Sequence, residues 1–167
     1  MENYQKGKNV EEPIVKENIP IKDLPEDFLW MQVRGGSKIR NLLSLAMEQF
    51  PEKQYIVWTG FGQSVGKAIT CAEIMKREHK QSLHQITRIC YRLVEEYWDP
   101  ITPGLDQLVV KRQLPMIHIL LSCNPLNNDD YGYQGPNTTI PYKPNEQRQR
   151  KFKSSEKRPK KHNPSKS

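Results

Sequence analysis

Cysteine and histidine are scarce in this chain of 167 residues, and long apolar runs are absent from it. The three cysteines are widely spaced and odd in number, which argues against a disulfide framework and against a cysteine pair with metal-ligand spacing. No apolar stretch approaches the roughly 18 residues of a membrane helix, and the opening residues, MENYQKGKNVEEP, contain no apolar signal-peptide core. These absences predict a soluble protein that stays inside the cell with reduced thiols and does not engage a membrane.

The same scarcity argues against catalysis. The four histidines show neither H-x-x-x-H nor H-x-E spacing, and His118 lies in the apolar run MIHILLS, where a core or interface residue is expected. Neighbouring acids such as Glu95 and Glu96 point apart in a strand and do not share one site. We predict no catalytic residue, metal, cofactor or small-molecule substrate, although a cysteine and a histidine from distant positions could still meet in space.

Proline is less frequent in the middle of the chain than in the two flanks. Of 13 prolines, four lie between residues 29 and 122, which leaves 13 − 4 = 9 in the flanks. Segments rich in proline and charge and poor in apolar residues do not usually join a core. The distribution predicts a disordered acidic segment over residues 1–28, a folded domain over residues 29–126 and a disordered, proline-containing tail over residues 127–167.

Basic residues are concentrated in that tail. From Lys143 onward ten basic residues stand against two acidic ones, a net +8, which leaves 7 − 8 = −1 for the rest of the chain. The run RQRKFKSSEKRPKKH is typical of an arm that binds nucleic acid or of a nuclear import signal, and a role in solubility alone stays open. Residues 29–122 still hold twelve basic and eight acidic residues, which leaves room for a basic face on the domain.

Apolar periodicity predicts the element order β-α-β-α-β-β. From Ser37 as the expected N-cap, apolar residues recur at helical spacing within an arc of about 140°, until Pro51 ends the first helix. A second helical stripe runs to about His79 and contains small residues that suit close packing on a sheet. Strands are expected at residues 29–33, 54–59, 83–97 and 116–122, with residues 108–112 extending a hairpin.

The glycine-rich turn 60–67, GFGQSVGK, lies between a strand and a helix, which is the setting of phosphate-binding loops. Its spacing matches neither nucleotide motif. Three residues instead of four separate Gly62 from Gly66, Ala68 follows Lys67 where a Walker A loop has Ser or Thr, and the glycines form G-x-G-x-x-x-G. We expect no nucleotide hydrolysis. Two interpretations stay open: backbone N–H groups and Lys67 hold an isolated phosphate, or glycine serves only the geometry of a tight connection.

Cations cluster at the start of the first helix. Lys38 and Arg40 lie in its opening turn and Arg34 precedes the glycines, although the positive end of the helix dipole disfavours cations there by about 0.3 to 1 kcal/mol each. Arg40 also occupies the position, three after Ser37, where a capping box has Glu or Gln. An anionic partner resting on this turn would offset the cost, because it gains from the dipole, the N–H groups and the cations together. Ordinary exposed charges at a helix end are the alternative.

Four segments together resemble the Alba family: MQVRGGSKIRNLLSLA, VWTGFGQSVGKAITCAEIMKR, LHQITRICYR and PMIHILLSCNPLNNDDYGYQGP. The resemblance covers about residues 29–136 and is strongest to the larger Alba-type subunit of ribonuclease P and ribonuclease MRP or to the close paralogue of that subunit. It implies an α/β fold (an α+β sandwich) with a mixed four-stranded sheet and two helices on one side. It also implies binding to structured ribonuclease P/MRP RNA, a heterodimer with the smaller Alba-type subunit, roles in tRNA 5′ maturation and rRNA processing, and a nuclear, nucleolar location.

The resemblance also implies where RNA binds, because the family's nucleic-acid contacts lie on the turn after the first strand, on the glycine turn and on the β-hairpin. This chain departs from the family in a longer region before the last strand and in a Lys-rich tail in place of RGG repeats. A DNA- or chromatin-binding role and a pure protein-interaction adaptor stay open as other functions. Carried over by motif, the implied RNA-binding residues are Arg34, Gly35, Gly36, Ser37, Lys38 and Arg40, then Gly60, Phe61, Gly62, Gln63 and Lys67, and on the hairpin Arg88 and Arg92, which share one face of a strand.

Overall fold

A computed structural model describes residues 2–138 of the chain. Among these residues, no helix combines the length and the apolar character that a membrane span requires. The predicted basic tail beyond Lys143 lies outside the described residues and stays a prediction. In chain order, the elements are β1 (Tyr4–Glu11), the 3-10 turn η1 (Lys16–Asn18), β2 (Leu29–Val33), α1 (Ile39–Lys53), β3 (Tyr55–Phe61), the 3-10 turn η2 (Gly62–Ser64), α2 (Val65–Glu78), β4 (His84–Pro100), β5 (Leu108–Ser122) and β6 (Tyr133–Gln134).

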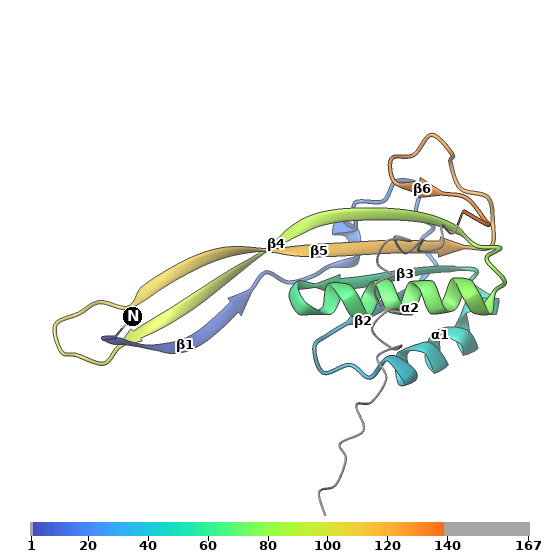
Figure 1. The fold of residues 1–167 in the computed structure, drawn as a ribbon. Helices are drawn as coiled ribbons and strands as arrows, with labels where there is room; N and C mark the ends of the chain where they lie inside the picture. The colour runs from blue at the N-terminus through green and yellow to red at the C-terminus, as the bar shows by residue number, and fades with distance from the viewer. Residues whose placement is uncertain (1, 139–167) are drawn as a thin grey trace, which may run out of the picture.

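The strands form one mixed sheet in the order β1-β4-β5-β3-β2, with β6 also paired to β4. β2 and β3 run parallel, and the remaining pairs are antiparallel. Both helices lie on the same side of this sheet (Figure 1). The predicted α/β fold is confirmed, and β1 and β6 are additions to its four expected strands.

The larger core lies between the helices and the sheet. Trp58 and Phe50 are its largest fully buried side chains, and Ala68 and Ala72 bring α2 close to β3. A Cβ on Gly60 would lie 2.8 Å from the carbonyl oxygen of Ser64 and 2.9 Å from the Cβ of Ala68. Gly60 is therefore required for this close approach of strand and helix.

Helix α1 differs from its prediction at both ends. Lys38, not Ser37, is the N-cap, and no side chain caps the helix. The Ser37 hydroxyl instead accepts a hydrogen bond from the backbone N–H of Arg34 at 3.0 Å, which stabilises the preceding turn. Pro51 lies inside the helix, which continues to Lys53 and ends at Gln54 in a left-handed conformation with φ of 58°. One missing N–H in the last turn does not stop a helix whose Phe50 is already packed in the core.

The structure also differs from the expectation for residues 1–28. Tyr4–Glu11 forms β1, and Ile19, Ile21 and Phe28 are buried on the sheet face opposite the helices. That face carries apolar side chains of its own, which a covering segment removes from water. These apolar residues stand singly among prolines and acids, so the local sequence resembles that of a disordered segment. The sheet supplies the packing partner that the local sequence does not show. At the other boundary, residues up to 138 continue past the expected tail start, and Tyr133 of β6 packs against the same face.

β4 and β5 pair from His84↔Ser122 to Trp98↔Leu108, and β1 pairs with the distal half of β4. β5 is one continuous strand through Pro115, where two pieces were expected. β3 pairs with β5 only as far as Met116, so Pro115 begins a free edge, where its missing N–H is tolerated. Beyond that point the three strands extend away from the helices (Figure 1). We call residues 4–11, 94–100 and 108–114 the arm.

Candidate nucleic-acid interface

Two turns meet at one edge of the domain. Because β2 and β3 are parallel neighbours, the turns that follow them leave the sheet at the same edge. Lys67 connects these turns: its ammonium donates hydrogen bonds to the carbonyl oxygen of Gly35 and, at 3.3 Å, to that of Ser37. We call residues 34–40 and 60–67 the twin-turn surface. The structure thus brings together both turns that the sequence predicted to contact RNA.

The twin-turn surface contains the N-termini of both helices. Neither α1 nor α2 has a side-chain cap, and neither has an acidic residue in its first turn. The first N–H groups of an α-helix have no partner within the helix, and the macrodipole places about half a positive charge there. At the start of α2 the Val65 N–H already donates to the Gly62 carbonyl of η2, so the donors suited to an anion are those in the first turn of α1.

Three cations on this surface are unpaired. Arg34, Lys38 and Arg40 are exposed, and their side chains form no hydrogen bond or ion pair with any residue in the range 2–138. The nearby Gln63 side chain is exposed as well. Among the described residues, no carboxylate pairs with these three cations to neutralise their positive potential.

The glycines of the two turns fall into two groups. Gly60 is required by packing and Gly62 by its φ of +52°. Gly35, Gly36 and Gly66 lie outside the left-handed region, and a Cβ on any of them would meet no atom within 4 Å. Geometry inside the domain therefore explains the first group but not the second. Missing side chains at exposed positions leave the backbone N–H groups open to close approach from outside.

The two hairpin arginines lie on one strand face, but both are engaged within the protein. Arg88 forms an ion pair with Asp130, and both side chains are largely buried. Arg92 donates to the Glu11 carboxylate at 2.6 Å and to the Glu12 carbonyl at 2.7 Å, and only 8% of Arg92 is exposed. In this conformation neither guanidinium is available to RNA as the unpaired cations are.

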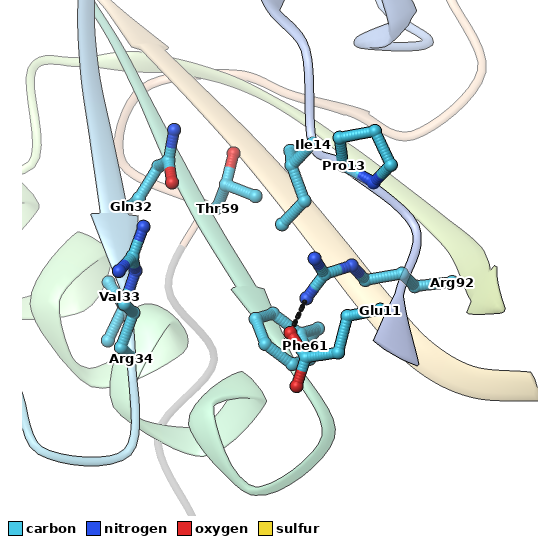
Figure 2. A pocket seen from close by; sticks show the side chains of 9 residues that line it. All are labelled: Glu11, Pro13, Ile14, Gln32, Val33, Arg34, Thr59, Phe61 and Arg92. Atoms are coloured by element: carbon cyan, nitrogen blue, oxygen red, sulfur yellow. Dashed lines mark hydrogen bonds and ion pairs between the residues drawn. The ribbon is translucent and has the colours of Figure 1, made fainter. Parts of the chain in front are cut away.

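A cavity of about 460 Å³ lies next to the twin-turn surface, on the sheet face opposite the helices. Figure 2 shows Gln32 and Arg34 on one side of it, with Ile14, Phe61 and Arg92 on the other. The Arg92 guanidinium lies 4.3 Å from the centre of the Phe61 ring. One wall of this cavity is formed by residues 11–14. Sequence reasoning missed the cavity because it expected that segment to be disordered. The alternation of side chains along a strand, which puts Gln32 on the face opposite Met31, is a local signal that could have pointed to the cavity.

Neither His118 nor Cys71 is placed for acid–base or nucleophilic chemistry. Burial lowers the pKa of His118 to about 4, and its Nδ1 lies 2.9 Å from the Thr59 hydroxyl. Burial raises the pKa of Cys71 to about 11, which keeps the thiol protonated at neutral pH. The prediction that His118 belongs to the core is confirmed. Within residues 2–138, no group of three or more potential ligands could hold a metal ion.

Comparisons with known proteins agree with this geometry. The sequence profile of the Alba family matches residues 29–92. The chain is 44% identical over 140 residues to the ribonuclease P protein subunit p25-like proteins of Bos taurus and of Homo sapiens, covering 81% of this chain and 83% of each relative. It is 37% identical over 156 residues to the ribonuclease P protein subunit p25 of Rattus norvegicus, covering 82% of this chain and 78% of that protein. The profile match contains both turns of the twin-turn surface.

Proposed function

Because the chain belongs to the Alba family, we propose that it is a non-catalytic RNA-binding subunit of a ribonuclease P ribonucleoprotein. Its similarity to ribonuclease P protein subunits supports this assignment. One structural observation carries it. Arg34, Lys38 and Arg40 are exposed, have no partner among residues 2–138, and lie beside two helix N-termini without side-chain caps. Phosphate groups of RNA supply the negative charge that this surface lacks.

The electrostatic cost of these cations in the free protein also supports RNA binding. Cations at a helix N-terminus lose about 0.3 to 1 kcal/mol each to the dipole, and no acidic residue compensates within the first turn of α1. A phosphate on this turn interacts favourably with the cations and with the dipole at once. Such contacts position an RNA backbone and do not read its sequence. Specificity for a structured RNA then comes from shape.

The finer parts of the proposal follow from this role. We propose that the RNA is the structured RNA of ribonuclease P or of ribonuclease MRP. The protein would thereby support tRNA 5′ maturation and rRNA processing, and it would be located in the nucleus, including the nucleolus. In this role the chain binds and positions RNA and takes no part in bond cleavage.

We propose further that the chain binds the smaller Alba-type subunit through β4. Ile89 and Tyr91 are 71% and 66% exposed, and Ile89 pairs with Ile117 on the sheet face that the helices cover. The helices pack over β2, β3 and β5, which leaves this apolar strip of β4 open. Adjacent exposed apolar side chains of this size are typical of an interface. A helix of the partner would complete the layer beside α2.

The test of RNA binding is charge reversal on the twin-turn surface. We expect the full-length double variant Lys38→Glu plus Arg40→Glu to lose RNA in co-purification, because two attractive contacts become repulsive. It should retain the smaller Alba-type subunit, since neither residue lies on the β4 strip. Unchanged RNA recovery would contradict the proposal and favour a protein-interaction adaptor. Duplex DNA bound at least as tightly as structured RNA would favour a DNA-binding role instead.

The test of the partner surface is a matched pair of substitutions. Ile89→Glu should abolish co-purification of the smaller subunit, because a charge replaces an apolar contact. Ile101→Glu changes an isoleucine of similar exposure, 61%, beyond the end of β4 and should have no effect. Equal retention of the partner by both variants would exclude the β4 strip as the interface.

A further inference from the structure

The cavity beside the twin-turn surface has the chemistry of a nucleotide site. Its walls combine the aromatic ring of Phe61, the apolar Ile14, the amide of Gln32 and the guanidinium of Arg34. Side chains of Gln32 and Arg34 form no hydrogen bond with any residue that the structure describes. A site with an aromatic and apolar wall and a few convergent polar groups suits a planar ligand that has hydrogen-bonding edges. Its volume of about 460 Å³ leaves room for one nucleobase.

The wall around Phe61 is held in place. Arg92 covers one side of the ring at 4.3 Å, and Arg92 itself is fixed by the Glu11 carboxylate and the Glu12 carbonyl. These two acceptors come from the N-terminal segment, so the ordering of residues 1–28 against the sheet creates the cavity. A preformed aromatic and guanidinium wall binds a stacked base without first having to be ordered.

Other occupants fit the same groups less well. A free phosphate ion would find Arg92 already neutralised by Glu11, and it would leave the apolar wall in contact with a charge. An apolar peptide side chain would bury the Gln32 amide and the Arg34 guanidinium without partners. A nucleotide satisfies all of these groups, because its base offers a flat face and polar edge atoms and its phosphate offers an acceptor for Arg34.

Arg34 connects the cavity to the twin-turn surface. It is one of the three unpaired cations there, and it also lines the cavity. A nucleotide in the cavity is therefore contiguous with a phosphate backbone held by Lys38 and Arg40. A base inside a duplex cannot reach such a site, whereas an unpaired base can leave its helix at low cost.

We propose that this cavity takes one unpaired nucleotide of the bound RNA. Its base lies between the Phe61–Arg92 wall and the Gln32 amide, and its phosphate lies beside Arg34. The inference rests on the proposed RNA-binding function and adds to it a preference for RNA with an unpaired nucleotide. Because an amide both donates and accepts, Gln32 can pair with any of the four bases, and the preference is for an unpaired base of any identity.

The experiment compares two RNA probes with the full-length chain at one salt concentration. One probe is a fully paired hairpin, and the other is the same hairpin with a single unpaired nucleotide in its stem. We expect wild-type protein to bind the bulged probe about tenfold more tightly, which is the size of effect that one stacked base provides. Gln32→Ala should reduce that preference to less than about twofold and leave affinity for the paired probe unchanged.

Gln49→Ala is the matched control, because Gln49 is an exposed glutamine of α1 that does not line the cavity. It should keep the full preference. Equal binding of both probes by wild-type protein, or an intact preference in Gln32→Ala, would overturn the nucleotide site while leaving the proposed function in place. Failure of wild-type protein to bind either probe would overturn the proposed function and the cavity proposal with it.

Discussion

The twin-turn surface and the arm contain similar cations in opposite settings. On the arm, Lys6 and Arg112 both pair with Glu96, at 3.4 and 2.9 Å, and Lys111 pairs with Glu95 at 3.3 Å. On the twin-turn surface, three cations have no partner among the described residues. A count of basic residues therefore does not show which of the two regions binds RNA. The structure distinguishes them by whether each charge is already neutralised.

Glu96 shows what this neutralisation means physically. The nearby Arg112 and Lys6 lower the pKa of Glu96 from its ordinary value, so its carboxylate stays ionised beside both cations. Exposed ion pairs of this kind contribute little to stability. They do reduce the local positive potential, since a phosphate approaching the arm also meets the carboxylates. We therefore expect RNA affinity to depend on the twin-turn surface much more than on the arm.

The largest expected effect is on stability, and it separates an arginine with a structural role, Arg88, from an arginine proposed to bind RNA, Arg34. Arg88→Ala leaves the Asp130 carboxylate largely buried and without its partner, so the free energy of unfolding should fall by about 3 kcal/mol. Arg34→Ala should change stability by less than about 0.5 kcal/mol, because its side chain is exposed and unpaired. Urea unfolding measures both values.

RNA affinity should show the reverse order for these two variants. Arg34→Ala weakens RNA binding severalfold, whereas the folded fraction of Arg88→Ala binds like wild type. An Arg88→Ala variant that is stable but weak in RNA binding would break the distinction between paired and unpaired cations.

The next effect concerns pH and uses His118 to separate folding from binding. The folded pKa of about 4 is below the ordinary 6.5, so the unfolded chain binds the proton more readily between these values. The stabilisation is complete above about pH 6.5 and is lost as pH falls toward 4. The free energy of unfolding should therefore be about 2 kcal/mol lower at pH 5 than at pH 8. Urea unfolding at both pH values measures the difference.

His118 is buried in the core and is not part of the twin-turn surface, so the RNA affinity of the folded protein should not fall together with its stability. His118→Gln should flatten this part of the pH dependence of stability. A pH dependence of stability that survives in His118→Gln would show that another group titrates.

A third, smaller effect divides the glycines. Gly60→Ala should destabilise the fold by about 2 kcal/mol, because its Cβ would lie 2.8 Å from the Ser64 carbonyl oxygen. Gly36→Ala should leave stability within about 0.5 kcal/mol. Gly36→Val should also fold, yet weaken RNA binding about tenfold by keeping phosphate away from the backbone N–H groups. Thermal unfolding and RNA binding on the same samples check both results. Unchanged RNA affinity in Gly36→Val would show that the open glycine is not a contact.

The smallest effect would make the arm resemble the twin-turn surface. Glu96→Gln removes the shared carboxylate and leaves Lys6 and Arg112 unpaired. RNA affinity should rise by about twofold to threefold, which filter binding at low salt can resolve. Glu48→Gln changes the net charge by the same amount at an exposed position of α1 and is the control. An equal rise in both variants would attribute the gain to net charge alone.

The order of elements could be predicted because it depends on local periodicity. Helix α1 and strand β2 each bury one face of a regular pattern, β3 is a short apolar run buried on both faces, and β2 begins and ends where predicted. The twin turns could be predicted as well, because a cation against a helix dipole is a local conflict. Their meeting through Lys67 depends on the parallel pairing of β2 and β3.

Other features depend on partners distant in sequence. The ion pairs of Arg88 with Asp130 and of Arg92 with Glu11 join residues 42 and 81 positions apart. Nothing beside either arginine in the sequence distinguishes it from an arginine that binds RNA. The packing of residues 19–28 on the sheet was missed for the same reason, since the apolar residues of this segment acquire a partner only when the sheet has formed. The cavity wall that this segment provides was therefore also beyond local prediction.

The most direct test of the central claim is the salt dependence of RNA binding in two matched double variants. Each neutralised phosphate contact contributes about 0.7 to 0.9 to the slope of log affinity against log salt. Lys38→Gln plus Arg40→Gln should reduce that slope by roughly 1.5, and Lys111→Gln plus Arg112→Gln should leave it unchanged. The full-length chain is used throughout, so the tail contributes equally to every slope. An equal reduction in both variants, or a change in the arm variant alone, would contradict the account.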